Sequence, residues 1–307
     1  MEAAKRFLVR AWRDAKTWRS LWLGPFTIYV RLARSTTAFG GPARRVRGRR
    51  FRGSVKPIDE LGVAGEPSNP SGSAREVALL IGNGPQIGPA IARKLSMKGM
   101  QVAVVSRNSE KLRRVADEAL ASGRTVHPYA ADVTNERAVR DVMQHVHQDI
   151  GVPDLVIYGV QASHPGSVLD TEVAAFEESW RSICLGAFVV GRESARCMVA
   201  AGRGTIVMLG ATSGVVGRAG YLNLAVGKFG LRAMAQVMAK ELGPKGIHVV
   251  HLVIDADVRA TVDGESTPRM LPDDLADLIW TLHKQPRSAW TSELDIRPFD
   301  ESFWEHC

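Results

Sequence analysis

Short apolar runs alternate with amphipathic stretches along residues 76–254, and this alternation limits the folds open to the chain more than any other feature. The apolar runs, each suited to a buried strand, are 76–81, 101–106, 125–130, 155–160, 205–210 and 248–254. The stretches with helical spacing are 88–98, 109–121, 135–149, 171–200 and 221–242. Alternation of this kind predicts an α/β fold, a doubly wound parallel sheet with right-handed crossovers and helices on both faces.

Charge divides the chain into two parts. Residues 1–58 hold 15 Lys and Arg residues against only Glu2 and Asp14, a net charge of +13. The whole chain of 307 residues carries +8, so the remainder carries −5. Because a stretch rich in Gly, Pro and Ser separates the two parts, we expect a basic arm (1–58), a linker (59–75) and one α/β domain (76–307).

The arm combines an amphipathic pattern with a block of like charges. Residues 3–22 repeat apolar side chains at helical spacing, with basic ones opposite, which predicts a helix. An Arg-rich amphipathic segment with few acidic residues is typical of a mitochondrial targeting sequence. The arginines from Arg44 to Arg52 also suit RNA or anionic lipid, and the whole arm suits wrapping around subunits of a large protein complex.

The composition argues against a helical membrane span, a disulfide framework and a zinc site. The longest apolar run, 21–30, is too short to span a bilayer as a helix. The three cysteines, Cys184, Cys197 and Cys307, are too few and too scattered for a disulfide framework or a zinc site. We therefore expect no metal site.

A glycine-rich turn follows the first apolar run. Gly82, Gly84 and Gly88 stand where the strand gives way to a helix, in the sequence IGNGPQIG. Glycines at such a turn let the backbone approach a pyrophosphate closely, and the helix N-terminus then points its amides at the phosphates. Together with Ile87 they predict the phosphate end of a Rossmann-like dinucleotide site.

The ends of the next strands indicate which dinucleotide is bound. Arg107 stands where an NAD-binding site would carry an acidic residue, and an arginine there suits the 2′-phosphate of NADP. Asp132, followed by Val133, is placed to accept a hydrogen bond from the adenine, and Gly159 follows the fourth strand. The sequence predicts NADP(H) as the cofactor; the alternative is a Rossmann-like unit with a vacant pocket.

Several segments of residues 76–303 match one family. They are the glycine turn, ADVTNE at 131–136, AFVVGRESARCM at 187–198, the helix around Lys228 and ELGPKGIHV at 241–249. On these segments the chain resembles the short-chain dehydrogenases/reductases, and most closely a subgroup with an incomplete glycine motif and an aromatic residue replacing the catalytic tyrosine. Members of that subgroup end in a segment similar to residues 280–299. The resemblance implies hydride transfer between a nicotinamide cofactor and a carbonyl or alcohol, and it is consistent with a homodimer.

The family's catalytic tetrad is incomplete in this chain. The resemblance assigns the lysine to Lys228, but the tyrosine position falls on Leu224, the serine position on Ala211 and the asparagine position on Ile183. Leucine, alanine and isoleucine carry no titratable group, so they cannot transfer a proton. Lys228 is expected to contact the cofactor ribose; the alternative is a partly buried lysine that serves local packing.

Two neighbouring hydroxyl groups are candidate substitutes for the missing donor. Thr212 follows the serine position, and Tyr221 shares a predicted helix face with Lys228. Tyr221 would lie about 10 Å from Lys228 along the helix axis, because each residue rises about 1.5 Å. That separation is too long for the lysine to activate the phenol easily.

These observations predict a catalytically degenerate, NADP(H)-binding pseudoenzyme that serves as an accessory subunit of a mitochondrial assembly through residues 1–58. A respiratory or ATP-synthase complex ranks slightly ahead of the mitochondrial ribosome, because the aromatic residues of 7–30 favour a protein or membrane contact. The alternative is an active NADP-dependent reductase with a substituted proton donor and a cleaved targeting arm. A third hypothesis is an RNA-associated scaffold with an empty pocket.

Overall fold

The computed structural model describes residues 75–121, 123–259, 270–299 and 301, together with the strand positions 17–23 and 26–31. Contacts divide the chain into a unit of residues 1–53 and a unit of residues 54–307, and each unit is described by itself. The predictions for residues 3–16, for Arg44 to Arg52 and for residues 59–74 of the linker lie outside the described residues.

An antiparallel hairpin is the described part of the first unit. Its strands are β1 (Thr17–Leu23) and β2 (Phe26–Arg31). The predicted helix over residues 3–22 is therefore wrong for residues 17–22. The two runs are rich in Thr, Trp, Ile, Tyr and Val, which favour strands, and the Gly-Pro pair between them favours a turn.

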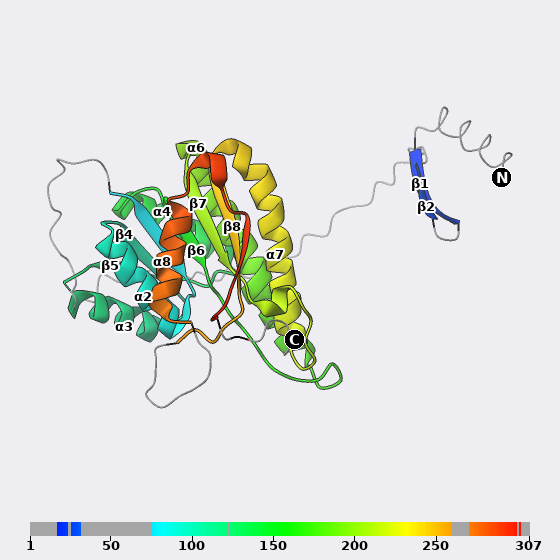
Figure 1. Ribbon diagram of the computed structural model, residues 1–307, viewed down its shortest axis with the longest axis horizontal. Coiled ribbons are helices and arrows are strands. Elements are labelled where there is room, and N and C mark those ends of the chain that lie inside the picture. Colours follow the sequence, from blue (N-terminus) through cyan, green and yellow to red (C-terminus); the bar gives the residue numbers. More distant parts are fainter. Residues whose placement is uncertain are drawn as a thin grey trace, which may run out of the picture. The chain divides into compact units, whose positions relative to one another are not determined.

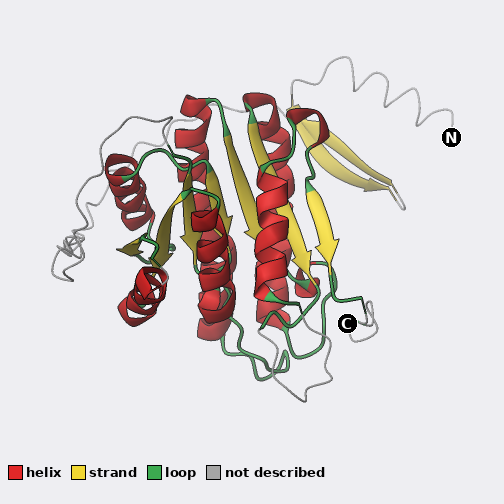
Figure 2. Ribbon diagram, turned by 60° about the vertical axis from the view of Figure 1, so that its left-hand side comes forward, coloured by secondary structure: helices red, strands yellow, loops and turns green. Residues whose placement is uncertain are grey.

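A seven-stranded sheet forms the centre of the second unit (Figures 1 and 2). In chain order its strands are β3 (Val77–Ile81), β4 (Gln101–Ser106), β5 (Val126–Ala130), β6 (Leu155–Tyr158), β7 (Gly204–Leu209), β8 (Ile247–Ile254) and β9 (Glu293–Ile296). All neighbours are parallel, in the spatial order β5-β4-β3-β6-β7-β8-β9. The predicted doubly wound parallel sheet is confirmed, and its switch point, where such sheets bind ligands, lies between β3 and β6.

Helices cover both faces of this sheet (Figure 2). One face carries α4 (Glu136–Asp149), α6 (Gly186–Ala201) and α7 (Leu222–Leu242), and the other carries α2 (Gly84–Met97), α3 (Ser109–Ala121) and α8 (Pro272–His283). Side chains of each strand alternate between the two cores, because successive residues of a strand point to opposite faces.

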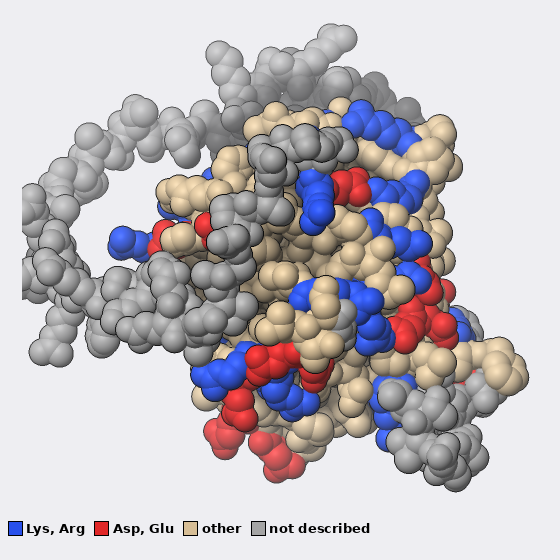
Figure 3. All heavy atoms as spheres, turned by 90° about the vertical axis from the view of Figure 1, so that its left-hand side faces the viewer, with Lys and Arg blue, Asp and Glu red and all other residues tan. Residues whose placement is uncertain are grey.

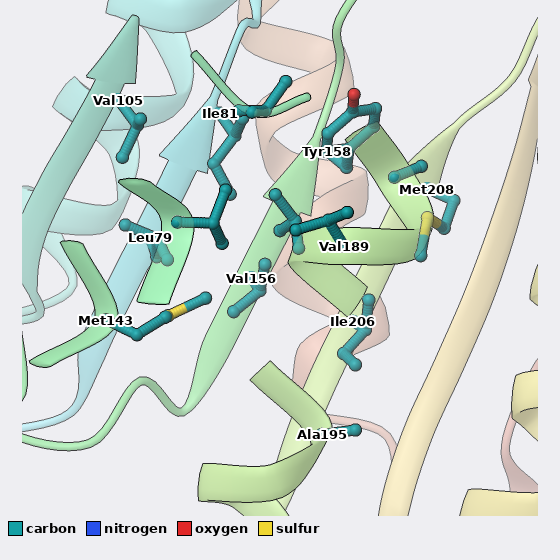
Figure 4. Close-up of a cluster of buried hydrophobic side chains, with 14 of the residues drawn as sticks. Leu79, Ile81, Val105, Met143, Val156, Tyr158, Val189, Ala195, Ile206 and Met208 are labelled. Atoms are coloured by element: carbon teal, nitrogen blue, oxygen red, sulfur yellow. The ribbon is translucent and has the colours of Figure 1, made fainter. Parts of the chain in front are cut away.

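The core beneath α4 and α6 shows how the strands and helices interlock (Figure 4). Leu79 of β3, Val156 of β6 and Ile206 of β7 are almost fully buried in one layer. Met143 of α4 and Val189 of α6 pack in the same cluster. This layer holds the strands in register, so the loops at their carboxyl ends are carried on a rigid base.

The long helix predicted over residues 171–200 contains a π-helical turn. α5 (Val173–Trp180) runs through the π-helical segment Arg181–Leu185 directly into α6. The hydroxyl of Tyr158, a buried residue of β6 that is labelled in Figure 4, donates a hydrogen bond to the Ser182 carbonyl of this segment, and the distance is 2.5 Å. Single π turns inside α-helices frequently occur at functional sites.

Charged side chains of both signs are interspersed over the face seen in Figure 3. Ion pairs also join neighbouring helices: Arg93 and Lys94 of α2 pair with Asp273 and Asp277 of α8. Such exposed pairs contribute only about 0–1 kcal/mol each. None of the described helices is both long and apolar enough to cross a membrane.

Candidate functional site

A cleft of about 810 Å³ lies at the switch point of the sheet. Residues that follow β3, β4, β5 and β6 line it, because the carboxyl ends of parallel strands meet at one edge. Eight of the nine residues predicted to bind the cofactor are among its walls: Gly82, Gly84, Ile87, Gly88, Arg107, Asp132, Val133 and Gly159.

The glycine turn at the base of this cleft has a left-handed backbone. Gly82 has φ +66° and Gly84 has φ +65°. A Cβ on Gly82 would lie 2.4 Å from Cγ2 of Val160, whereas a Cβ on Gly84 would meet nothing within 4 Å. α2 begins at Gly84 rather than at residue 88 as predicted, with Pro85 in its first turn. The first amides of α2 have no partner within the helix and are available to a phosphate.

Asn83 supplies an unsatisfied polar atom inside the cleft. Its side chain is 6% exposed, and its Nδ2 donates to the Ile157 carbonyl at 3.4 Å. Its Oδ1 has no hydrogen-bond partner among the described residues, and a Cβ on Gly159 would lie 2.2 Å from it. Leaving such an acceptor unpaired costs about 1–3 kcal/mol, so a ligand hydroxyl or amino group fits here. Asn83 was not predicted from the sequence, although its place between two predicted glycines was a signal.

The far end of the cleft is basic. Arg107 follows β4, and Lys111 and Arg114 of α3 line the cleft beside it. The sequence analysis missed the last two, yet their i, i+3 spacing on the helix predicted over 109–121 places them on one face. Across the cleft, Asp132 Oδ1 accepts hydrogen bonds of 2.9 Å from the amide and the hydroxyl of Thr134, which fixes the orientation of the carboxylate.

Two of the positions that the resemblance assigns to the family's tetrad, Ile183 and Leu224, lie in the core on the α7 side of the sheet. Ile183 is fully buried, and a Cβ on Gly227 of α7 would lie 3.0 Å from Ile183 Cβ. Leu224 is buried in the same core. Ala211 directly precedes the 3-10 turn Thr212–Gly214, which follows β7. At three of these positions, Ile183, Ala211 and Leu224, the side chain carries no group that could donate a proton.

Lys228, at the position assigned to the tetrad lysine, makes a hydrogen bond within the protein. Its side chain is 3% exposed, and its Nζ donates to the Leu209 carbonyl at 2.8 Å. Burial lowers the pKa of this lysine to about 8. Lys228 is not among the residues that line the cleft, and its contact with a cofactor ribose stays a prediction.

The two candidate substitutes have different surroundings. Thr212 Oγ1 donates a hydrogen bond of 2.5 Å to Oδ1 of Asp255, the residue that follows β8. Tyr221 directly precedes α7, and the Arg218 guanidinium lies 5.5 Å from the centre of its ring. Thr212 is therefore hydrogen-bonded to a carboxylate, whereas the ring of Tyr221 lies beside a guanidinium. Asp255 was not predicted as a site residue, although an acidic residue at the end of a predicted strand was a signal.

The part of the chain that the structure describes contains no group of three or more His, Cys, Asp or Glu side chains that could hold a metal ion. Cys184 and Cys197 are half-buried, and burial raises the pKa of both thiols. Neither thiol has the lowered pKa typical of a reactive cysteine.

Comparison with known proteins identifies the family. Residues 76–262 match the family model described as short chain dehydrogenase. Sorbitol-6-phosphate 2-dehydrogenase of Escherichia coli (strain K12) is 30% identical over 182 residues, which cover 58% of this chain and 70% of that enzyme. A short-chain dehydrogenase from Rhodopseudomonas palustris is 38% identical in its crystal structure, with a TM-score of 0.66, and covers 73% of this chain and 99% of its own. A metagenomic short-chain oxidoreductase in complex with NADP is 26% identical, with a TM-score of 0.64, over 73% of this chain and 97% of its own.

These relatives overturn the prediction of a catalytically degenerate accessory subunit. They are named as dehydrogenases or oxidoreductases, one of them is solved with NADP, and their names indicate no role in a larger assembly. That prediction equated the loss of three side chains with the loss of the reaction. A hydroxyl and a carboxylate, those of Thr212 and Asp255, nevertheless lie in contact where β7 and β8 end. The chain belongs to the short-chain dehydrogenase/reductase family.

Proposed function

We propose that this protein is an active NADP(H)-dependent reductase in which another group replaces the family's tyrosine as proton donor. The observation that carries this proposal is the cleft at the switch point, with its glycine turn, its unpaired Asn83 acceptor and its basic end. The relative that is 26% identical and solved with NADP supports the choice of cofactor.

Different residues of the cleft would bind different parts of the cofactor. The turn at Gly82 and Gly84 and the first amides of α2 would bind the pyrophosphate. Arg107 would bind the 2′-phosphate, with Lys111 and Arg114 adding positive charge. When bound, NADPH supplies a hydride to a substrate carbonyl carbon. This chain must then orient the carbonyl and deliver one proton to its oxygen.

Two measurements test the proposal. Titration of the full chain with NADPH and with NADH, followed by tryptophan fluorescence, is expected to show saturable binding and a preference for NADPH. Consumption of NADPH, followed by its absorbance with a panel of aldehydes and ketones, is expected to exceed that of heat-denatured protein. Binding without turnover of any carbonyl would contradict the activity, and absence of binding would contradict the whole proposal.

We further propose that the basic arm is a targeting segment removed before the enzyme acts, with the mitochondrion as its destination. Its support is compositional: 15 basic residues against two acidic ones in residues 1–58. The mass of the N-terminal peptide in protein isolated from its natural source tests this. A mature chain that begins downstream of the arm is expected, and retention of Met1 would count against it.

A further inference from the structure

A hydroxyl and a carboxylate are in direct contact where β7 and β8 end. Thr212 begins the turn after β7, Asp255 follows β8, and Thr212 Oγ1 donates to Asp255 Oδ1 at 2.5 Å. Because parallel strands end at one edge of a sheet, this pair lies on the same edge as the cofactor cleft. Val258, three residues beyond Asp255, is part of the cleft wall.

Backbone hydrogen bonds position both partners. The amide of Asp255 donates to the Ile296 carbonyl of β9 at 2.9 Å. The Thr212 carbonyl accepts from the amides of Val215 and Val216 at 2.9 and 3.0 Å, which closes the turn. The Asp255 side chain is only 16% exposed. The short contact is therefore held by the main chain of three neighbouring elements.

The charges around the pair come from β9, α7 and β8. Arg297, which follows β9, places Nη1 4.0 Å from Asp255 Oδ2, and its Nη2 pairs with Asp295 at 2.7 Å. On the α7 side, Lys228 binds the carbonyl at the end of β7. On β8 itself, His251 is bound to Glu293 at 3.0 Å. One Asp255 oxygen thus accepts from a hydroxyl, and the other faces a cation at longer range.

We propose that Thr212 is the proton donor of the reduction and that Asp255 is the positioning residue that orients the Thr212 hydroxyl and relays its replacement proton from water. This inference rests on the proposed function. Ala211, which occupies the family's serine position, directly precedes Thr212. The hydroxyl therefore stands one residue from the position that the resemblance assigns to the serine of the tetrad.

The proton balance of the step is simple. When the carbonyl carbon gains its hydride, the C=O π pair moves to the oxygen, which becomes an alkoxide. The alkoxide takes the hydroxyl proton of Thr212, and Thr212 regains a proton from water through the Asp255 carboxylate, which relays the proton and ends unchanged. In alcohol oxidation the same path runs in reverse, and the Thr212-to-Asp255 hydrogen bond has the direction that this reverse transfer needs.

Matched variants at position 212 test the donor. Thr212→Val keeps the shape but removes the hydroxyl, and it is expected to lower kcat about 10²–10⁴-fold, the usual contribution of a general acid. Thr212→Ser keeps the hydroxyl and is expected to stay within about tenfold of the wild type. NADPH affinity and thermal unfolding should be the same in both, which separates loss of the donor from loss of the fold.

Asp255→Asn and the double variant test the positioning residue. Asp255→Asn is expected to lower kcat with little change in KM and to alter the solvent deuterium isotope effect on kcat, because asparagine cannot relay a proton from water to Thr212. The Thr212→Val/Asp255→Asn double variant should be no slower than the Thr212→Val variant, since residues that act as one unit give non-additive losses. Independent structural roles would instead give losses that multiply, together with weaker NADPH binding.

The outcomes distinguish this inference from the proposed function. An active wild type whose Thr212→Val variant equals the Thr212→Ser variant overturns the role of Thr212 and leaves the proposed function standing. The same conclusion follows when Tyr221→Phe, and not Thr212→Val, abolishes turnover. A wild type that binds NADPH but reduces no carbonyl overturns both proposals.

Discussion

Gly82 and Gly84 have nearly the same φ angle but different surroundings, and substitution separates the effect of φ from the effect of the surroundings. Gly82→Ala places a Cβ 2.4 Å from Val160, whereas Gly84→Ala meets open space. We expect Gly84→Ala to lower the free energy of unfolding by about 1–2 kcal/mol, the cost of a left-handed alanine. Gly82→Ala should lose about 1–3 kcal/mol more through overpacking. Urea unfolding of both variants measures this, and equal losses would contradict the close approach to Val160.

Arg107 decides cofactor preference in the proposed function. Arg107→Ala is expected to weaken NADPH binding about 10–100-fold, because a hydrogen bond to a charged group contributes about 1.5–3 kcal/mol. NADH, which lacks the 2′-phosphate, should bind with nearly unchanged affinity. Arg113→Ala, on the following helix α3 but outside the cleft wall, is the matched control. Fluorescence titration checks all three proteins, and a parallel loss of NADH affinity would assign Arg107 to the fold instead.

At the scale of elements, Asp154 joins three strands at the amino edge of the sheet. It is 5% exposed, and its Oδ2 accepts from the Val77 amide of β3 at 2.9 Å. Its Oδ1 accepts from Arg203 at 2.7 Å, and its carbonyl accepts from the Thr205 amide of β7 at 2.8 Å. Asp154 therefore connects the amino ends of β3, β6 and β7.

Asp154→Asn is expected to lower the free energy of unfolding by about 1–3 kcal/mol, because one buried partner loses its acceptor. Asp273→Asn provides the control, since that side chain is 66% exposed and pairs with Arg93 only at the surface. It should cost less than about 1 kcal/mol. Chemical denaturation compares the two. Equal effects would mean that the hydrogen bond to β3 contributes little.

Elements with strong periodicity could be predicted from the sequence, whereas the start of α2 and the edge strand β9 could not. α3 has the predicted bounds, Ser109–Ala121. The start of α2 was missed because Gly84 and Pro85 suggest a turn, although proline also fits the first turn of a helix. β9 was missed because its four residues, Glu293–Ile296, alternate in burial and depend on pairing with β8. Such long-range pairing leaves no local signal.

Some features of the candidate site could also be predicted from the sequence, and others could not. The cleft residues were predictable, because each follows a strand and strand ends meet at one edge. The contact between Thr212 and Asp255 was not predictable, because the two residues are 43 positions apart in sequence and meet only through the register of β7 and β8. Lys228 was predicted at a ribose, but its bond to the Leu209 carbonyl depends on packing of α7 against β7.

For the whole molecule, burial of Lys228 gives stability a distinctive pH dependence. The pKa of this lysine is about 8 in the folded protein against 10.5 for an ordinary lysine. Between these values the unfolded chain binds more protons, so the free energy of unfolding rises with pH, by at most about 1.4 kcal/mol per pH unit. Lys228→Met lacks this titration.

The difference between wild type and Lys228→Met isolates that contribution. We expect the wild type to gain stability relative to the variant as the pH is raised from about 8 towards about 10. Raised tyrosine pKa values, as for buried Tyr158, act in the opposite direction but cancel in the comparison. Urea unfolding across this range is the measurement. A difference that stays constant with pH would show that Lys228 titrates normally.

The π-helical turn at Arg181–Leu185 bears on how the site could be redesigned. It holds Ile183, the position that the resemblance assigns to the family's asparagine, beside Gly227 of α7. A helical irregularity of this kind belongs to the main chain, so replacing a side chain on it leaves the path of the backbone in place. Ile183→Asn, Ala211→Ser and Leu224→Tyr would therefore install the family's tetrad on the backbone that this chain already has.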